Sequence, residues 1–218
     1  MNLVDELQNC AESSDVLTVL RKAKRLSSKL GRNDISTWLQ SEMDGYGSGQ
    51  SVPTYRMIQT TFAYNSNGYI PAGYGFVKSG VEDLQPMGIE SPVKFRESIS
   101  VILMLIDRVN NGNKIYNQID RYSKFDISLR NMFHFHPIIA DQISLLIHLN
   151  EFEVKAIPDR IKDTILDWAC ALERAGVTGE GMSFSEKEKG IAHQVTINIS
   201  GSQISQLTSS GNNYGGAK

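Results

Sequence analysis

Apolar residues recur at helical spacing between Val16 and Leu30, and this periodicity constrains the fold more than any other feature of the chain. The repeat gathers one apolar stripe on one side of a helix, and such a stripe has to be buried against other elements. Its members are Val16, Val19, Leu20, Ala23, Leu26 and Leu30. Gly31 follows the last of them, where a helix end favours a glycine in the left-handed conformation. The chain therefore needs a core built by packed helices.

Similar periodicity predicts five further helices, over residues 2–11, 34–43, 96–109, 155–175 and 186–193. Trp38 and Trp168 lie on apolar faces of two of them, so we expect both side chains to be buried. The stretch from Val101 to Ile106 is apolar nearly all round, which predicts a central helix. Ser185 and Glu188 have the spacing of a capping box at the start of the last helix.

Within the predicted domain, strand signals lie in the middle of the chain. Residues 57–64 alternate with period two, and 69–78 form a second, broken extended segment. Weaker signals predict short strands over 114–119 and 130–136. Residues 44–49 are rich in glycine and follow a helix, so we interpret them as a flexible connector rather than a phosphate-binding loop. The predicted fold class is α+β, a mainly α-helical domain with a small irregular sheet.

The C-terminal segment differs in composition from everything before it. Charge is absent from Val195 until Lys218, and Ser, Thr, Asn, Gln and Gly dominate. We predict a domain over 1–193 and a polar, β-prone tail over 194–218. A lone strand is unstable, so it has to pair with the sheet near 57–78 or with the same segment of another chain. We favour the second partner, which predicts a homo-oligomer. The expected self-association residues are Val195, Ile197, Ile199 and Ile204.

A basic face lies opposite the apolar stripe of the helix over 16–30. Between positions 21 and 32 the chain contains no acid. The residues of this face are Arg21, Lys22, Arg25, Lys29 and Arg32. Two interpretations are open. The face contacts an anion such as nucleic acid, or it is solvated and paired with nearby acids such as Asp34, Glu42 and Asp44.

Composition limits the classes of protein to which the chain can belong. It has 218 residues, a net charge of −2 and 40% apolar residues, which is typical of a globular protein that needs no disulfide or metal to fold. The apolar runs are far shorter than the ~20 residues of a membrane span. The two cysteines form no disulfide framework or zinc motif. We expect a cytoplasmic protein without a cofactor or a membrane partner.

Catalytic chemistry has little support in the sequence. His134 and His136 share one face of a predicted strand, but no further ligand is spaced to complete a metal site. Asp159, Asp163 and Asp167 lie in a row on one helix face. A metal-dependent nuclease could use such a row, although neighbouring basic residues and the helix dipole also explain it. We predict no catalytic residue and no metal ligand.

Several segments taken together resemble the AbiTii domain of bacterial abortive-infection proteins. They are Leu20–Gly31, Trp38 and Leu39 with Glu42, Asp44–Tyr46, Val52–Arg56, and later 161–175 and 176–188. The resemblance covers roughly residues 3–193 and is loose over 57–150. Family members usually have an Arg-rich start of the helix near 157–165, where this chain has only Arg160 and Lys162.

The resemblance implies a role in bacterial antiviral defence and supplies no reaction. Our leading hypothesis is a sensing or assembly module that acts through protein–protein contacts, with a phage-derived or operon-encoded protein as a further partner. The alternative is a nucleic-acid-binding effector that uses the basic helix over 16–32. An enzyme is the least favoured class.

Overall fold

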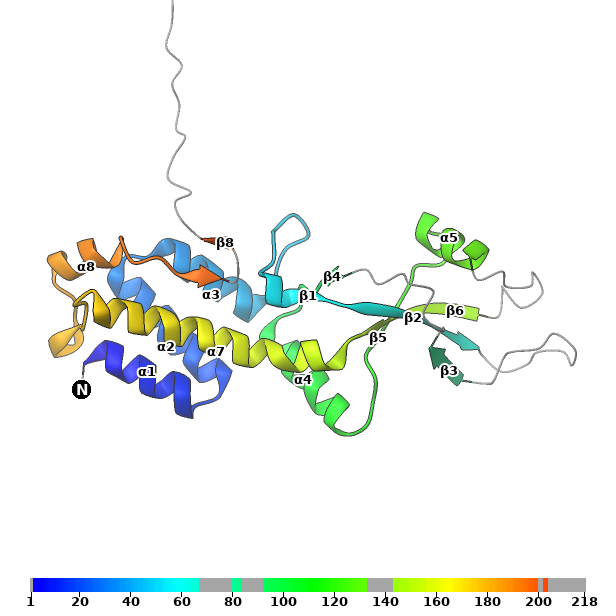
Figure 1. The fold of residues 1–218 in the computed structure, drawn as a ribbon, viewed down its shortest axis with the longest axis horizontal. Coiled ribbons are helices and arrows are strands. Elements are labelled where there is room, and N and C mark those ends of the chain that lie inside the picture. Colours follow the sequence, from blue (N-terminus) through cyan, green and yellow to red (C-terminus); the bar gives the residue numbers. More distant parts are fainter. Residues whose placement is uncertain (1, 67–79, 84–91, 133–142, 200–201, 204–218) are drawn as a thin grey trace, which may run out of the picture. The chain divides into compact units, whose positions relative to one another are not determined.

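The computed structural model describes residues 2–66, 80–83, 92–132, 143–199 and 202–203 (Figure 1). Its helices and small sheets confirm the predicted α+β class. The chain divides into two compact units, of which unit 1 comprises Met1–Met43 and Asp159–Lys218 and unit 2 comprises Asp44–Pro158. Unit 2 is therefore one continuous segment inserted into the sequence of unit 1. The predicted boundary between a domain and a tail at 193/194 stays a prediction.

Unit 1 is built from helices. Its elements are α1 (Leu3–Ser13), α2 (Val16–Leu30), α3 (Asn33–Asp44), the part of α7 (Glu151–Arg174) from Asp159 onward, a 3-10 turn (Glu180–Met182) and α8 (Glu186–Ala192). The bounds of α2 are those that the apolar stripe predicts. All six stripe residues are buried, and α1 and α8 lie beside α2.

The ends of these helices follow the capping rules that their sequences suggest. Asp15 caps α2 by accepting a hydrogen bond from the backbone N–H of Thr18. Gly31 ends α2 with φ 73°, in the left-handed region that glycine adopts without a steric penalty. The predicted capping box at Ser185 and Glu188 is confirmed.

Both tryptophans are buried, as their positions predict: Trp38 is 5% and Trp168 1% exposed. Their indole N–H groups differ in hydrogen bonding. The indole N–H of Trp38 donates to Glu42 Oε1 over 3.2 Å, inside the unit. The indole N–H of Trp168 has no hydrogen-bond partner within the described ranges.

Unit 2 is organised around a four-stranded antiparallel sheet with the strand order β3-β2-β6-β5. Its strands are β2 (Thr60–Ser66), β3 (Gly80–Asp83), β5 (Tyr116–Gln118) and β6 (Ile143–Leu149). A second pair joins β1 (Met57–Ile58), which follows a 3-10 turn over Thr54–Arg56, to β4 (Val93–Lys94). The buried cluster of the larger sheet contains Phe62, Tyr64, Ile119, Leu129, Ile143 and Leu145.

Two features of unit 2 correct the sequence analysis, and two predicted segments are left untested. The strand predicted over 130–136 is wrong at its start, because Arg130 lies in α5 (Lys124–Met132). Residues 133–136 and the predicted segment 69–78 lie outside the described residues. The central strand β6 was not predicted, because its run of apolar residues lacks the alternation of a half-buried strand.

The helix α4 (Ile99–Asn110) starts three residues later than predicted and is not central. Only Ile99 and Ile102 are buried among its residues, and Met104 is 56% exposed. Of the apolar stretch from Val101 to Ile106, only Ile102 is buried, because α4 packs on one face only.

The glycine-rich segment 44–49 is tied down rather than flexible. Gly45 has φ 96°, and a Cβ placed there would come within 2.9 Å of the Arg96 carbonyl oxygen. The Tyr46 N–H donates to that same carbonyl, and the Arg96 guanidinium donates to the carbonyls of Gly47 and Gln50. Glycine is required at position 45 because both the backbone conformation and the close approach exclude a side chain.

In the part of the chain that the structure describes, no helix is long and apolar enough to cross a membrane.

Candidate functional site

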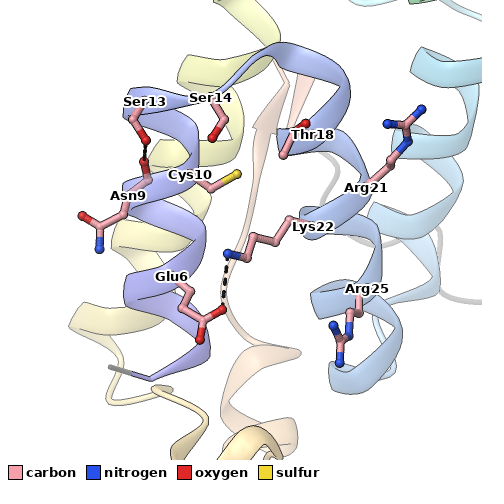
Figure 2. A pocket seen from close by; sticks show the side chains of 9 residues that line it. All are labelled: Glu6, Asn9, Cys10, Ser13, Ser14, Thr18, Arg21, Lys22 and Arg25. Carbon is pink, nitrogen blue, oxygen red and sulfur yellow. Dashed lines mark hydrogen bonds and ion pairs between the residues drawn. The ribbon is translucent and has the colours of Figure 1, made fainter.

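The candidate site of unit 1 is a groove between α1 and α2, with a volume of about 540 Å³ (Figure 2). Three of the predicted basic residues lie in its lining. The lining residues are Glu6, Asn9, Cys10, Ser13 and Ser14 from α1 and the following turn, and Thr18, Arg21, Lys22 and Arg25 from α2. The groove forms because α1 and α2 run side by side after the turn at Ser14 and Asp15. We call it the α1–α2 groove.

One cation of the groove is paired across it. Lys22 extends from α2 toward α1, and its Nζ lies 3.3 Å from Glu6 Oε2 (Figure 2). Both side chains are partly exposed, so solvent screens the pair and it adds little stability. Its main consequence is positional, because it holds an ammonium group inside the groove.

Arg21 and Arg25 are exposed and lie four residues apart, so they neighbour each other on the surface of α2. Neither guanidinium makes a hydrogen bond or an ion pair with any residue that the structure describes. The helix α2 itself contains no acid. The two guanidinium groups point apart (Figure 2), and both face solvent, where an anion can reach them.

The structure removes Arg32 from the exposed basic face. Its side chain is 4% exposed, and its guanidinium donates two bonds to Asp34, of 2.9 and 2.7 Å. It also donates to the carbonyl of Ala192 and, over 2.6 Å, to that of Val195. The hydrogen bonds from Arg32 hold the pKa of Asp34 below its ordinary value. Periodicity alone could not show this, because Arg32 follows the helix end at Gly31.

The remaining lysines of the face are also engaged. Lys29 donates to the backbone carbonyl of Met182, and Lys24 donates to the side-chain amide of Gln40. Of the five predicted contact residues, the structure thus gathers Arg21, Lys22 and Arg25 at the groove and directs Lys29 and Arg32 to internal acceptors. Whether the gathered residues bind an anion stays a prediction.

The first turn of α1 is held by the loop between α7 and α8, and Glu188 of α8 anchors that loop. The Glu188 carboxylate accepts backbone N–H bonds from Thr178, Gly179 and Ser185, of 3.0, 2.9 and 2.8 Å. These bonds, foremost that from Gly179, lower the pKa of Glu188 to about 2. The Thr178 carbonyl in turn accepts the N–H of Val4. The loop after α7 therefore fixes one wall of the α1–α2 groove.

The predicted self-association residues separate into two groups. Ile197 is 1% exposed and belongs to the core of unit 1, and Val195 is half-buried, with its carbonyl bound by Arg32. Ile199 lies in β7 (Asn198–Ile199), which pairs with β8 (Ser202–Gln203) in a short hairpin. Ile204 lies outside the described residues.

The acidic row of α7 gives no sign of a metal centre. Asp159, Asp163 and Asp167 are all exposed on one side of the helix. Within the described ranges, no three His, Cys, Asp or Glu residues are grouped closely enough to hold a metal ion. The predicted pair His134 and His136 lies outside those ranges.

One polar constellation in unit 2 was missed by the sequence analysis. His148 Nδ1 lies 3.3 Å from Thr61 Oγ1, and its Nε2 lies 2.7 Å from Glu151 Oε1. Burial raises the pKa of Glu151, but the hydrogen bond with His148, a backbone hydrogen bond and the nearby charges of His148 and Lys114 together outweigh burial, so the pKa is lowered. Thr61 and His148 are opposite each other in the β2–β6 register, so only knowledge of that pairing could have found them. Tyr116 packs against the His148 ring, with centroids 4.9 Å apart. The arrangement ties β5, β2 and α7 to β6.

The segments that resemble a known family include buried, architectural residues. Arg56 is fully buried, lies 5.0 Å from the centroid of the Tyr46 ring, and donates to the carbonyls of Phe95 and Glu97 over 3.3 and 2.6 Å. Comparison with family models gives a match to AbiTii over residues 2–197. The chain belongs to the AbiTii family. Comparisons with curated proteins and with solved structures found no match.

Membership of the AbiTii family indicates a role in abortive-infection defence. The match ends at Ile197, which is buried in unit 1.

Proposed function

We propose that this AbiTii protein acts in abortive-infection defence as a sensing and assembly module, which forms homo-oligomers through the chain that follows Ile197. The observation that carries the proposal is the fixed exit of that segment. Arg32 binds the carbonyls of Ala192 and Val195, and Ile197 is buried. A segment that leaves a folded unit from a fixed point is presented in one orientation, which reduces the entropic cost of association.

The composition of the segment supports association with its own copies. Residues 196–217 contain no charge, so the repulsion that protects exposed strand edges is missing. Among the described strands, β7 and β8 pair only with each other. Their outer edges therefore offer backbone donors and acceptors, and uncharged Asn, Gln and Ser strands stack well on identical copies.

Light scattering of the purified full chain tests this proposal. We expect an oligomeric mass for the full chain and a monomeric mass for a chain that ends at Ile197. The cut belongs after Ile197 rather than at 194, because Val195 and Ile197 are part of unit 1. Ile199→Lys should also lower the mass, since it places like charges together at each interface, whereas Ser28→Lys on the exposed surface of α2 should not. Equal masses for all four proteins would refute the assembly role.

A sensing role requires a second partner, and we propose a phage-derived or operon-encoded protein. The second candidate function is a nucleic-acid-binding effector, which Arg21 and Arg25 support, because both are exposed and neither has a partner among the described residues. Fluorescence polarisation with labelled RNA and DNA tests it. Binding should weaken steeply with salt, and each lost phosphate contact should reduce the log–log slope by about one. Arg21→Gln should reduce this slope, and Arg160→Gln, an exposed arginine on α7, should leave it unchanged.

A further inference from the structure

We infer that α4 carries a second self-association surface, on which the same helix of another copy of this chain packs antiparallel. The surface consists of Val101, Met104 and Leu105, and we call it the outer α4 face. The inference rests on the proposed function, in which the chain after Ile197 brings copies together. Three observations carry it: the apolar composition of α4, the exposure of the outer α4 face, and the opposite charges at its two ends.

The helix α4 has more apolar surface than unit 2 covers. Its buried residues, Ile99 and Ile102, lie on one side. The residues of the outer α4 face follow the spacing i, i+3, i+4 and therefore share another side of the helix. Met104 is 56% exposed, and Val101 and Leu105 are half-buried. A helix that is apolar on all sides is typical of a buried position, so the outer α4 face requires a cover that unit 2 does not supply.

The charges around the outer α4 face indicate what covers it. No charged residue lies between Glu97 and Asp107. Arg108 continues the row of Val101 and Met104 by one helical turn, and Glu97 precedes that row by one turn. Both charged residues are exposed, and neither side chain has a partner among the described residues. An acid at one end and a base at the other make the face complementary to an antiparallel copy of itself.

The spacing of these residues defines one register of the pair. A two-fold axis between positions 102 and 103 places Val101 of each copy opposite Met104 of the other. The same axis places Glu97 of each copy opposite Arg108 of the other, because both pairs have the same midpoint in the sequence. An apolar centre is then flanked by two reciprocal ion pairs, as an isologous contact requires. A second copy therefore satisfies both the apolar centre and the charges.

The contact is expected to be weak on its own. The helix α4 has 12 residues and is about 18 Å long, so a single helix pair is small beside the roughly 1,200–2,000 Å² of a stable interface. Copies that the segment after Ile197 already holds together have a high effective concentration for one another, which strengthens a second, weak contact. The outer α4 face thus adds to the proposed assembly and leaves the chain that ends at Ile197 monomeric in dilute solution.

Sedimentation velocity tests the face on the full chain carrying Ile199→Lys, which weakens the proposed contact after Ile197. Up to about 1 mM protein we expect a reversible dimer. Arg108→Glu should raise its Kd at least tenfold, because it places two carboxylates together at each end of the helix pair. Arg160→Glu is the matched control, since it reverses an exposed arginine on α7 and should leave the Kd unchanged. Circular dichroism of each variant confirms that it is folded.

The double reversal Glu97→Arg/Arg108→Glu is the sharper variant. It restores both ion pairs with opposite polarity, so it should return the Kd to within about threefold of the parent. A partner of another kind, or a general loss of structure, would not be repaired in this way. The inference is overturned if no dimer forms at about 1 mM, if Arg108→Glu and Arg160→Glu dimerise equally, or if the double reversal stays as weak as Arg108→Glu.

The outcomes separate this inference from the proposed assembly. An oligomeric full chain whose Ile199→Lys variant forms no dimer retains the assembly through the segment after Ile197 and overturns the outer α4 face. A full chain that is monomeric in dilute solution refutes that assembly. Dimerisation at high concentration that Arg108→Glu weakens and the double reversal restores supports the outer α4 face in either case.

Discussion

The two units of this protein owe their folds to different parts of the sequence. In unit 1, each helix is encoded by the periodicity and caps of its own segment, and Val16–Leu30 is the clearest case. In unit 2, the central strand β6 pairs with β2, which lies about eighty residues earlier in the chain. Local patterns therefore specify unit 1, and long-range backbone pairing specifies unit 2.

A buried arginine fastens distant chain segments in both units, but the partners differ. Arg32 of unit 1 combines a bidentate bond to Asp34 with bonds to carbonyls near the C-terminal end of the AbiTii fold. Arg56 of unit 2 combines the face of the Tyr46 ring with two carbonyls of the segment after β4. In each case a charged guanidinium group satisfies carbonyl oxygens at a helix end or in a loop.

The largest effect is expected in the helical core of unit 1. Trp168→Ala should lower the free energy of unfolding by about 3–5 kcal/mol, because it leaves a large cavity among packed helices. Urea unfolding followed by circular dichroism measures the loss. A mutant within about 0.5 kcal/mol of the wild type would mean that the periodic core does not dominate unit 1.

The tryptophans also provide a matched pair for hydrogen bonding. Trp168→Phe should cost less than Trp38→Phe, because the Trp168 indole N–H bonds to no described residue and the Trp38 N–H donates to the buried Glu42. The expected difference between the two substitutions is about 1 kcal/mol, and the same urea titration resolves it. Equal costs would show that packing alone decides both positions.

In unit 2, Arg56→Met should cost about 3 kcal/mol, because the substitution leaves two carbonyls without their charged donor. Amide hydrogen exchange provides the sharper test. We expect faster exchange at Phe95 N–H, which donates to the Arg56 carbonyl, and in the β1–β4 pair. Unchanged protection there would mean that the arginine does not fasten the two segments.

The corresponding variant of unit 1, Arg32→Met, should cost about 2 kcal/mol, since part of the loss is offset by removing the burial of a charge. Its characteristic consequence is local. Residues 192–197 should become more susceptible to proteolysis, because the carbonyls of Ala192 and Val195 lose their donor. Wild-type resistance of this segment would contradict the fixed exit on which the proposed assembly depends.

The difference between the units also explains what the sequence could predict. The helices of unit 1 were predicted within a few residues, because each apolar stripe is visible inside its own segment. The strand β6 was not, since a continuous apolar run looks the same in a buried strand and in a buried helix. The prediction of a strand at Arg130 failed for a related reason: its hydrogen bonds to Asp126 stabilise a helix turn, and an i,i+4 pair is easily overlooked in a weak signal.

The sequence could predict which residue types the candidate site contains, but not how they are arranged. The sequence shows a face of five basic residues on or near one helix, but it cannot show which of them a distant carbonyl will engage. Arg32 is directed inward by carbonyls about 160 residues away, and Lys29 is engaged at the surface by the carbonyl of Met182. Glu6, which forms an ion pair with Lys22, lies on the neighbouring helix α1. Because of these tertiary contacts, only Arg21 and Arg25 of the predicted basic face have no partner among the described residues.

The smallest effect concerns the loop that holds α1, where a local motif and a long-range contact act together. Glu188→Gln should cost about 1 kcal/mol near neutral pH, the usual cost of losing a helix cap. The reason is that the carboxylate accepts the N–H groups of Thr178 and Gly179 as well as that of Ser185 in its own capping box.

The dependence on pH identifies the charge as the cause. The pKa of Glu188 is lowered from an ordinary 4.5 to about 2 in the folded protein, so the unfolded chain binds more protons between these two values. The contribution of Glu188 is therefore complete above about pH 4.5 and is lost as the pH falls through about 2. Thermal unfolding at a series of pH values should show the wild type approaching Glu188→Gln as the pH decreases. A constant difference between the two would mean that the geometry of the side chain, rather than its charge, secures the loop and with it the wall of the α1–α2 groove.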